Sequence, residues 1–385
     1  MIMARHAVEM PAALDRVIAD CQVVAVCGPG GVGKTTIAAT IAVAAARRGT
    51  ACVITIDPAR RLAQTLGISN PGDGPHTIDL GGGGRVDAVS LDAKRTFDAL
   101  VAQYAPSEEA CDRILANRLY QELSSTVSGS HEYAAVERLV ELHEAGDYNT
   151  IVLDTPPSRQ AVDFLDAPGR VTKLIDGRAL RALRRDGDGR TGRAVGSASK
   201  LVRKTVERLL GESLVGEVTE FAAAFDGMYD GFRDRAAAAR ALLESPASTF
   251  VTVTTPDREP LDDLPTFHKE LERRQLELGF TVMNRIHPSP LEETASEMLP
   301  PEDLGELRRL AEHDLTAASV PSDVRAHLTN SLLFVEQRAR VDRQVLDDLR
   351  ATLIDRPILV APLLVEAPTN LAALSDLADI LLGQR

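Results

Sequence analysis

Six short runs of apolar residues recur along the chain, and each is typical of a strand whose two faces are both covered. The runs are QVVAVC (22–27), ACVITI (51–56), TIVLD (150–154), TFVTVT (249–254), FTVMN (280–284) and PILVAP (357–362). Such nearly continuous, β-branched stretches belong in a parallel sheet with helices on both faces. Helical patterns separate the runs, as right-handed crossovers require. The pattern therefore predicts an α/β fold with a mostly parallel, doubly wound sheet.

Helices are predicted between the strands and in two longer intervals. The first helix covers about Lys34 to Arg48 and is rich in alanine, and we expect Gly49 to be its C-cap. The intervals 92–146 and 167–248 hold no convincing parallel strand and have helical patterns. In the second interval, apolar residues recur at three- and four-residue spacing, as in one amphipathic stripe. They are Leu201, Val202, Val206, Leu209, Leu210, Leu214, Val218 and Phe221.

The order of these segments predicts one α/β domain whose loops carry a helical subdomain. The α/β domain comprises residues 1–91, 147–166 and 249–385, and the two helical insertions comprise residues 92–146 and 167–248. Near the end of the sequence, four leucines repeat on one helical face: Leu371, Leu374, Leu377 and Leu381. We expect this closing helix to pack on the sheet.

Composition and charge narrow the class of protein. The net charge of −13 over 385 residues argues against general nucleic-acid binding, because phosphate backbones attract the opposite sign. The segment from Pro168 to Arg208 has twelve Lys or Arg against four Asp or Glu, a local balance of +8. This segment is either a solvated helical face or a surface that contacts acidic partners or anionic lipid at the membrane periphery.

Cysteine usage and the beginning of the sequence indicate a cytoplasmic protein. The four cysteines form no C-x-x-C pair, and three of them lie in or beside apolar runs, as small hydrophobic residues do. The first twenty residues carry Glu9, Asp15 and Asp20 and lack the apolar core of a secretory signal. The longest apolar stretch, Ile37 to Ala46, is too short to span a bilayer.

The stretch CGPGGVGKTT carries the strongest chemical signal. Gly28-x-x-x-x-Gly33-Lys34-Thr35 matches the P-loop pattern in full, and it lies between a predicted strand and a predicted helix. Backbone N–H groups of such a loop converge on phosphate oxygens at the positive end of the helix. We predict that Lys34 reaches the β- and γ-phosphates and that the Thr35 hydroxyl coordinates Mg²⁺. The predicted nucleotide-binding residues of the loop are Gly28, Gly30, Gly31, Val32, Gly33, Lys34, Thr35 and Thr36.

Two aspartates follow predicted strands at the edge of the sheet where ligands bind in open α/β folds. Asp57 comes directly after the second strand, so it either orients the attacking water or caps the helix that follows. Asp154 ends an apolar strand, as a Walker-B carboxylate does, and would hold a magnesium-bound water; the alternative is again a helix cap. The segment Thr155-Pro156-Pro157 would then lie beside the γ-phosphate and sense its presence.

Two later residues are weaker candidates for an adenine pocket. Asn284 ends a late strand, and its amide offers the donor and acceptor pair that adenine accepts on DNA base edges. The turn around Pro362, after the final strand, would form the other wall.

Taken together and in order, the GGVGKTT loop, the DPA after the second strand, the DTPPS segment before FLD and the late N-R strand resemble the arsenical-pump and tail-anchored-protein-targeting ATPase family. That family belongs to the deviant-Walker-A P-loop class. The resemblance implies a dimer that ATP and Mg²⁺ close, and helical subdomains that carry a protein client or effector. It also implies that Lys34 and Asp57 are catalytic, that Thr35 and Asp154 hold the metal, and that Asn284 reads adenine.

One departure from the family bears on the mechanism. The family's signature lysine, which reaches the partner's phosphates, is replaced by Pro29, which has no charge and no N–H. A positive group supplied in trans is worth roughly 10³ to 10⁵ in rate. Two switch segments also differ from the family's motifs: they are Asp57-Pro58-Ala59-Arg60-Arg61 and the segment from Asp154 to Gln160. No C-x-x-C pair for a dimer zinc, no cysteine triad for arsenite and no methionine-rich client groove are evident in the sequence.

Three hypotheses account for Pro29. A lysine-bearing paralogue completes the site, in place of a homodimer. Alternatively Arg60, Arg61 or Arg159 supplies the missing charge. In the third, the protein is a nucleotide-dependent binding module with negligible turnover.

Overall fold

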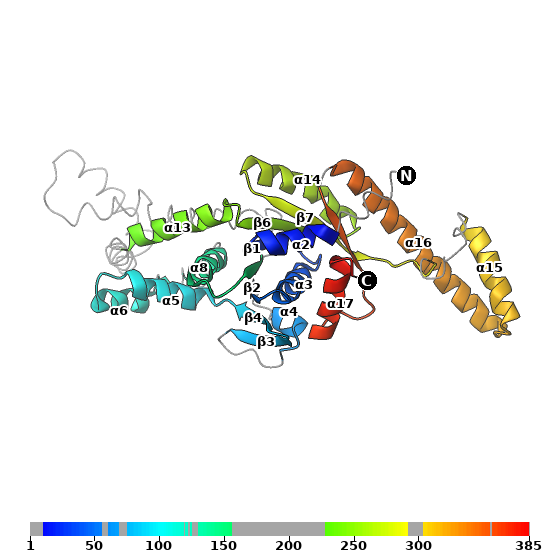
Figure 1. Ribbon diagram of the computed structural model, residues 1–385, viewed down its shortest axis with the longest axis horizontal. Helices are drawn as coiled ribbons and strands as arrows, with labels where there is room; N and C mark the ends of the chain where they lie inside the picture. The colour runs from blue at the N-terminus through cyan, green and yellow to red at the C-terminus, as the bar shows by residue number, and fades with distance from the viewer. Residues whose placement is uncertain are drawn as a thin grey trace, which may run out of the picture.

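The strands of the protein form one eight-stranded sheet (Figure 1). The computed structural model describes residues 11–55, 61–68, 75–118, 120–121, 124, 130–155, 228–291, 303–354 and 356–384. The strands are β1 (Val23–Cys27), β2 (Thr50–Thr55), β3 (His76–Gly81), β4 (Gly84–Ser90), β5 (Thr150–Asp154), β6 (Ser248–Thr254), β7 (Leu278–Ile286) and β8 (Ile358–Pro362). Their order in the sheet is β3-β4-β2-β5-β1-β6-β7-β8, and only β3 runs antiparallel to its neighbour.

Helices cover both faces of this sheet. In the described residues they are α2 (Pro11–Asp20), α3 (Lys34–Ala46), α4 (Arg61–Thr65), α5 (Ala93–Tyr104), α6 (Glu108–Ala116), α8 (Ser130–Ala145), α13 (Tyr229–Leu243), α14 (Arg258–Arg273), α15 (Leu304–Ala317), α16 (Ser322–Thr352) and α17 (Leu371–Leu381). The α/β fold with a mostly parallel sheet, expected from the apolar runs, is therefore confirmed. All six expected strands are present, with bounds that differ by no more than two residues.

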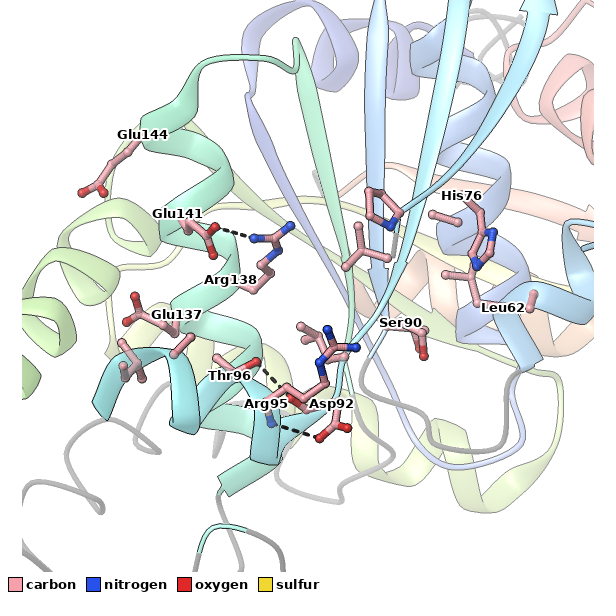
Figure 2. A pocket seen from close by; sticks show the side chains of 18 of the residues that line it. Leu62, His76, Ser90, Asp92, Arg95, Thr96, Glu137, Arg138, Glu141 and Glu144 are labelled. Carbon is pink, nitrogen blue, oxygen red and sulfur yellow. Dashed lines mark hydrogen bonds and ion pairs between the residues drawn. The ribbon is translucent and has the colours of Figure 1, made fainter. Parts of the chain in front are cut away.

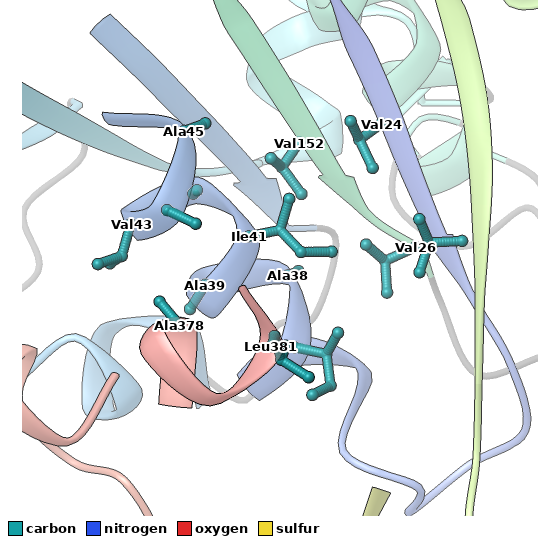
Figure 3. Close-up of a cluster of buried hydrophobic side chains, with 14 of the residues drawn as sticks. Val24, Val26, Ala38, Ala39, Ile41, Val43, Ala45, Val152, Ala378 and Leu381 are labelled. Carbon is teal, nitrogen blue, oxygen red and sulfur yellow. The ribbon is translucent and has the colours of Figure 1, made fainter. Parts of the chain in front are cut away.

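Alternate residues of the strands face two separate hydrophobic cores. Val24 and Val26 of β1 pack into the core beneath α2, α3 and α17, while Val23 and Ala25 pack on the opposite face with α8 and α13. Figure 3 shows the first core, in which α3 lies between the sheet and α17. Small alanines on α3 let it approach the strands closely, and nearly all of the helix is buried. The predicted closing helix is α17, and it covers α3 as well as the end of the sheet beside β8.

Two groups of helices extend from the sheet at opposite ends (Figure 1). Helices α5, α6 and α8 share a third core with Tyr120 and Met228, and they fall within the first predicted helical insertion. At the other end, α15 and the 31-residue α16 form a helical hairpin between β7 and β8 that the sequence pattern did not indicate. The amphipathic stripe expected at residues 201–221 lies outside the described residues.

The expected end of the first helix was wrong. Helix α3 ends at Ala46, and its C-cap is Arg47 in a right-handed conformation. Gly49 has no left-handed backbone; instead, a Cβ atom there would come within 2.2 Å of the Asn149 side-chain oxygen. The glycine is therefore required by the close approach of the loop before β5, because Asn149 accepts a hydrogen bond from the N–H of Thr50.

Candidate functional site

The glycine-rich loop lies at the centre of the sheet, at the carboxyl end of β1. Strand β1 pairs with β5 on one side and β6 on the other, so the loop opens at the point where the strand order diverges. Gly28, Gly31 and Gly33 have positive φ angles of 150°, 82° and 93°. A Cβ atom at Gly28 would lie 2.3 Å from the Val253 carbonyl oxygen of β6. Glycine is thus needed both for the turn and for its tight seat on the next strand.

The loop leads directly into the first turn of α3, whose N-terminus has no side-chain cap. The first intrahelical bond runs from Ile37 N–H to the Gly33 carbonyl oxygen, so the preceding N–H groups of the turn are left for other acceptors. Val32 is buried and anchors the loop, while Gly30 and Gly31 are exposed. An uncapped N-terminus beside a glycine turn suits an anion such as a phosphate group.

Lys34 is buried at the first position of α3, and its ammonium group is held by its own loop. The Nζ atom donates a hydrogen bond of 2.8 Å to the carbonyl oxygen of Pro29. Pro29 thus contributes through its carbonyl group to the position of the lysine. The N–H that proline lacks plays no part in this contact.

Two threonine hydroxyls converge on one oxygen of Asp154. Thr35 Oγ1 donates to Asp154 Oδ2 at 2.8 Å, and Thr55 Oγ1 donates to the same oxygen at 2.9 Å. Asp154 and Thr55 are 3% and 1% exposed, and they face each other across the paired ends of β5 and β2. The sequence predicted that Thr35 and Asp154 lie together, and the structure places them in direct contact. It did not predict Thr55, for which the available signal is a polar residue near the end of an apolar strand.

Asn284 contacts the P-loop itself. Its Nδ2 donates to the Val32 carbonyl oxygen at 2.8 Å, and its Oδ1 accepts from the N–H of Arg285 at 3.0 Å. A Cβ atom at Gly33 would lie 2.3 Å from the same Nδ2, so the glycine makes room for the amide. Arg285 has a φ of 65°, which is unusual for a residue other than glycine. It lies where the register between β7 and β8 shifts, between Asn284 and Ile286. The adenine-reading role of Asn284 stays a prediction.

The other predicted site residues are less informative or lie elsewhere. Thr36 accepts a hydrogen bond from Thr40 through its carbonyl oxygen, and Pro362 ends β8 in register with Ile286. Arg61 begins α4. The segment 56–60, with Asp57 and Arg60, lies outside the described residues, as does Arg159.

A cavity of about 500 Å³ adjoins this site (Figure 2). It lies between α4, β4, α5 and α8, and Thr55 contributes to its wall as well as to the Asp154 contact. Charged side chains of both signs line it, and Arg138 pairs with Glu141 at its edge.

The cysteine nearest the loop is chemically inert. Burial raises the pKa of the Cys27 thiol to about 12, although the hydrogen bond with Thr155 partly offsets this effect. The thiol stays protonated at neutral pH and fills space in the core.

The sheet, the loop on β1 and the Thr35–Asp154 contact define the class of P-loop NTPases. A family model described as anion-transporting ATPase matches residues 21–301, and the chain belongs to this family, whose members are ATPases of the arsenical-pump and GET3 type. Within the described residues, no helix is long and apolar enough to cross a membrane.

Three relatives show the range of similarity. The chain is 29% identical over 263 residues, 68% of its length, to an uncharacterized protein of Streptomyces coelicolor. It is 26% identical over 149 residues, 38% of its length, to the ATPase GET3 of Malassezia globosa. It is 32% identical over 162 residues, 39% of its length, to a putative arsenical pump-driving ATPase of Halobacterium salinarum. The matched segments span only 61%, 43% and 24% of these three relatives.

Proposed function

We propose that the protein is an ATP-binding and ATP-hydrolysing switch that works as a dimer and couples its nucleotide state to a helical client or effector region. The observation that supports this best is the contact between Thr35 and Asp154 at the start of α3. It brings a P-loop hydroxyl and a strand-terminal carboxylate to one buried point. Mg²⁺ prefers such oxygen donors and usually takes only one or two from the protein, with the rest from phosphates and water.

The residues of the loop divide the work of holding ATP. Backbone N–H groups of Gly28 and of Gly30 to Thr36 would bind the phosphates, and Lys34 would exchange the Pro29 carbonyl for the β- and γ-phosphates. Thr35 and Asp154 would hold Mg²⁺, which when bound neutralises developing charge on the phosphate oxygens. Asp57 would orient and deprotonate the attacking water. Asn284 and the turn at Pro362 would contact adenine. The Asn284 amide would then either give up its hydrogen bond to the Val32 carbonyl oxygen or donate one N–H to that oxygen and one to the base.

We further propose that a lysine-bearing paralogue is the partner. The family's lysine reaches the phosphates of the facing subunit, and Pro29 carries no charge. In a homodimer neither site would receive a cation from this position, whereas a paralogue with the lysine would supply one to the site of this chain. A homodimer in which Arg60, Arg61 or Arg159 takes that role is the alternative within the same mechanism. The client or effector would bind the helical region that α5, α6, α8 and α13 begin to form.

A second candidate function is a nucleotide-dependent binding module with negligible turnover. The replacement of the signature lysine by Pro29 favours it, because ATP would then shift conformation without rapid hydrolysis. The two candidates differ in turnover and agree in nucleotide binding.

Calorimetry with ATP and Mg²⁺, followed by phosphate release assays, tests both candidates. The purified chain should bind ATP, and Lys34→Ala should lose that binding, whereas Lys94→Ala, which removes an exposed lysine on α5, should not. Phosphate release should rise when the lysine-bearing paralogue is added, and a paralogue without that lysine should give no increase. Tight binding with negligible turnover in every pairing would favour the module instead. Absence of ATP binding to the unmodified chain would refute both.

A further inference from the structure

Asn284 links the end of β7 to the P-loop. It is 7% exposed, and its Nδ2 donates to the Val32 carbonyl oxygen at 2.8 Å. Strand β6 separates β7 from β1 in the sheet, so strand pairing does not join the end of β7 to the loop that follows β1. The side-chain hydrogen bond connects these two parts of the carboxyl edge.

This hydrogen bond fixes the orientation of one peptide group in the loop. The carbonyl group of Val32 and the N–H of Gly33 belong to the same trans peptide, in which the two groups point in opposite directions. With the carbonyl oxygen held by Asn284, the Gly33 N–H points away from β7. Gly33 is the N-cap of α3, so its N–H belongs with those of the first helical turn that an anion can use.

The backbone of Gly33 does not select this orientation by itself. Its φ is 93°, and a half-turn of the peptide would bring φ into the negative range, which glycine adopts about as readily. After such a flip the Val32 carbonyl oxygen, and not the Gly33 N–H, would face the side on which an anion is expected. The two orientations therefore have opposite electrostatic effects on a phosphate, and the bond from Asn284 favours the attractive one.

The same glycine makes the contact possible. A Cβ atom at Gly33 would lie 2.3 Å from Asn284 Nδ2, so a larger residue would push the amide away. Glycine is thus required for the approach of Asn284, and Asn284 supplies the preference that glycine lacks.

The position of Asn284 is itself supported by the residues that follow it. Its Oδ1 accepts from the N–H of Arg285 at 3.0 Å, which leaves Nδ2 as the end of the amide that faces Val32. Further on, His287 donates its N–H to the buried Asp342 Oδ2 of α16 at 2.9 Å, and its Nδ1 lies 2.7 Å from the same oxygen. The segment that carries the amide is therefore anchored to the sheet before it and to α16 after it.

We propose that Asn284 is a positioning residue for phosphate binding, which holds the Val32–Gly33 peptide with its N–H turned towards the phosphates whichever base the nucleotide carries. The inference rests on the proposed binding of ATP at the P-loop, and it adds a role to the contact with adenine. The amide has two N–H groups, so one stays on Val32 while the other serves the base. Without the hydrogen bond, only part of the molecules would hold a competent loop, and the apparent dissociation constant would rise in proportion.

Calorimetry with a base-free ligand, tripolyphosphate with Mg²⁺, separates this role from recognition of the base. Asn284→Leu removes the donor at nearly the same size, and Asn284→Ala removes the whole amide. Both variants should bind tripolyphosphate about ten-fold more weakly than the unmodified chain, the equivalent of one buried hydrogen bond, and should lose ATP affinity by at least the same factor. Weaker binding of ATP with unchanged binding of tripolyphosphate would show that Asn284 acts through the base alone and would overturn the proposal, as would unchanged binding of both ligands.

Thr281→Val is the matched control for a merely structural role. It removes a buried hydrogen bond from the same strand, in which Thr281 Oγ1 lies 2.8 Å from Thr252 Oγ1, and it does not touch the loop. This variant should unfold at a lower urea concentration and yet keep its tripolyphosphate affinity within about two-fold. The urea curves of the two Asn284 variants verify that both are folded. An equal loss of affinity in Thr281→Val would point to general loosening of β7 and against a specific role for the amide.

Failure of this inference and failure of the proposed function give different results. An unmodified chain that binds neither ATP nor tripolyphosphate would refute the proposed function, and the inference with it. A chain that binds ATP but not tripolyphosphate would overturn the positioning role alone, because its loop would then need the base in order to bind phosphate.

Discussion

A buried histidine makes the stability of the protein sensitive to mild acid. His268 on α14 is 7% exposed, and its Nε2 lies 3.2 Å from Thr252 Oγ1, which in turn lies 2.8 Å from Thr281 Oγ1. Burial, together with the nearby charge of Arg356, lowers the pKa of His268 from 6.5 to about 4, and Glu272 opposes the shift. The folded protein therefore keeps the ring neutral at a pH where the unfolded chain protonates it.

The sign and size of the effect follow from this difference. Because the unfolded chain binds the proton more readily, the free energy of unfolding falls as the pH drops from about 6.5 towards 4. At pH 5 the ring is almost fully protonated in the unfolded chain and mostly neutral in the folded protein. This difference lowers the free energy of unfolding by about 2 kcal/mol relative to neutral pH. Above pH 7 the ring is neutral in both states and the contribution disappears.

Urea unfolding at pH 7.5 and pH 5.0 measures this contribution. His268→Gln keeps a hydrogen-bonding side chain but cannot titrate, so it should lose about 2 kcal/mol less than the unmodified protein between the two pH values. His313→Gln, on the exposed surface of α15, removes a histidine without touching the core and is the matched control. An equal loss of stability in the unmodified protein and in His268→Gln would refute the reasoning.

Three further predictions concern the site and its supports. Gly33→Ala should lower the free energy of unfolding by about 2 kcal/mol, from left-handed strain and the contact with Asn284, and by clearly less when Asn284→Ala makes room; equal costs in both backgrounds would contradict the steric account. Thr55→Val should cost about 1 to 3 kcal/mol by removing a buried hydrogen bond to Asp154, and should weaken Mg²⁺-dependent ATP binding in calorimetry; unchanged affinity would separate Thr55 from the site. Arg235→Gln should lower the free energy of unfolding by about 2 to 3 kcal/mol in chemical denaturation, because it removes the charge that pairs α13 with the largely buried Glu137 of α8; a loss below about 0.5 kcal/mol would contradict this account.

The strands were predictable where apolar character is continuous. The runs that became β1, β5 and β6 are buried on both faces, so nearly every position has to be apolar. Strands β3 and β4 were missed because they form an antiparallel hairpin at the sheet edge, with alternating exposure on β3 and glycines at the turn. Their polar positions lack the signal on which the other predictions depended.

Long-range contacts explain why the remaining features could not be predicted from the sequence. The phosphate loop is a local motif, so its glycines and Lys34 could be found from one stretch of sequence. The bond from Asn284 to Val32 joins residues 252 positions apart, and no pattern within either segment indicates it. Helix α16 was obscured because some of its buried positions are polar, among them Glu336 and Asp342, which face partners from the segment after β7.

The cover that α17 provides for α3 has a consequence for biosynthesis. Arg47, at the end of α3, pairs with Asp379 of α17, which follows 332 residues later. At ribosomal rates of about 5–20 residues per second, roughly 15 to 70 seconds separate the synthesis of the two helices. During that interval the alanine-rich side of α3 cannot pack against α17, because α17 has not yet been synthesised. The helix that follows the phosphate loop is therefore fully covered only after α17 has been synthesised, and mutations in α17 should impair the yield of folded protein from cells.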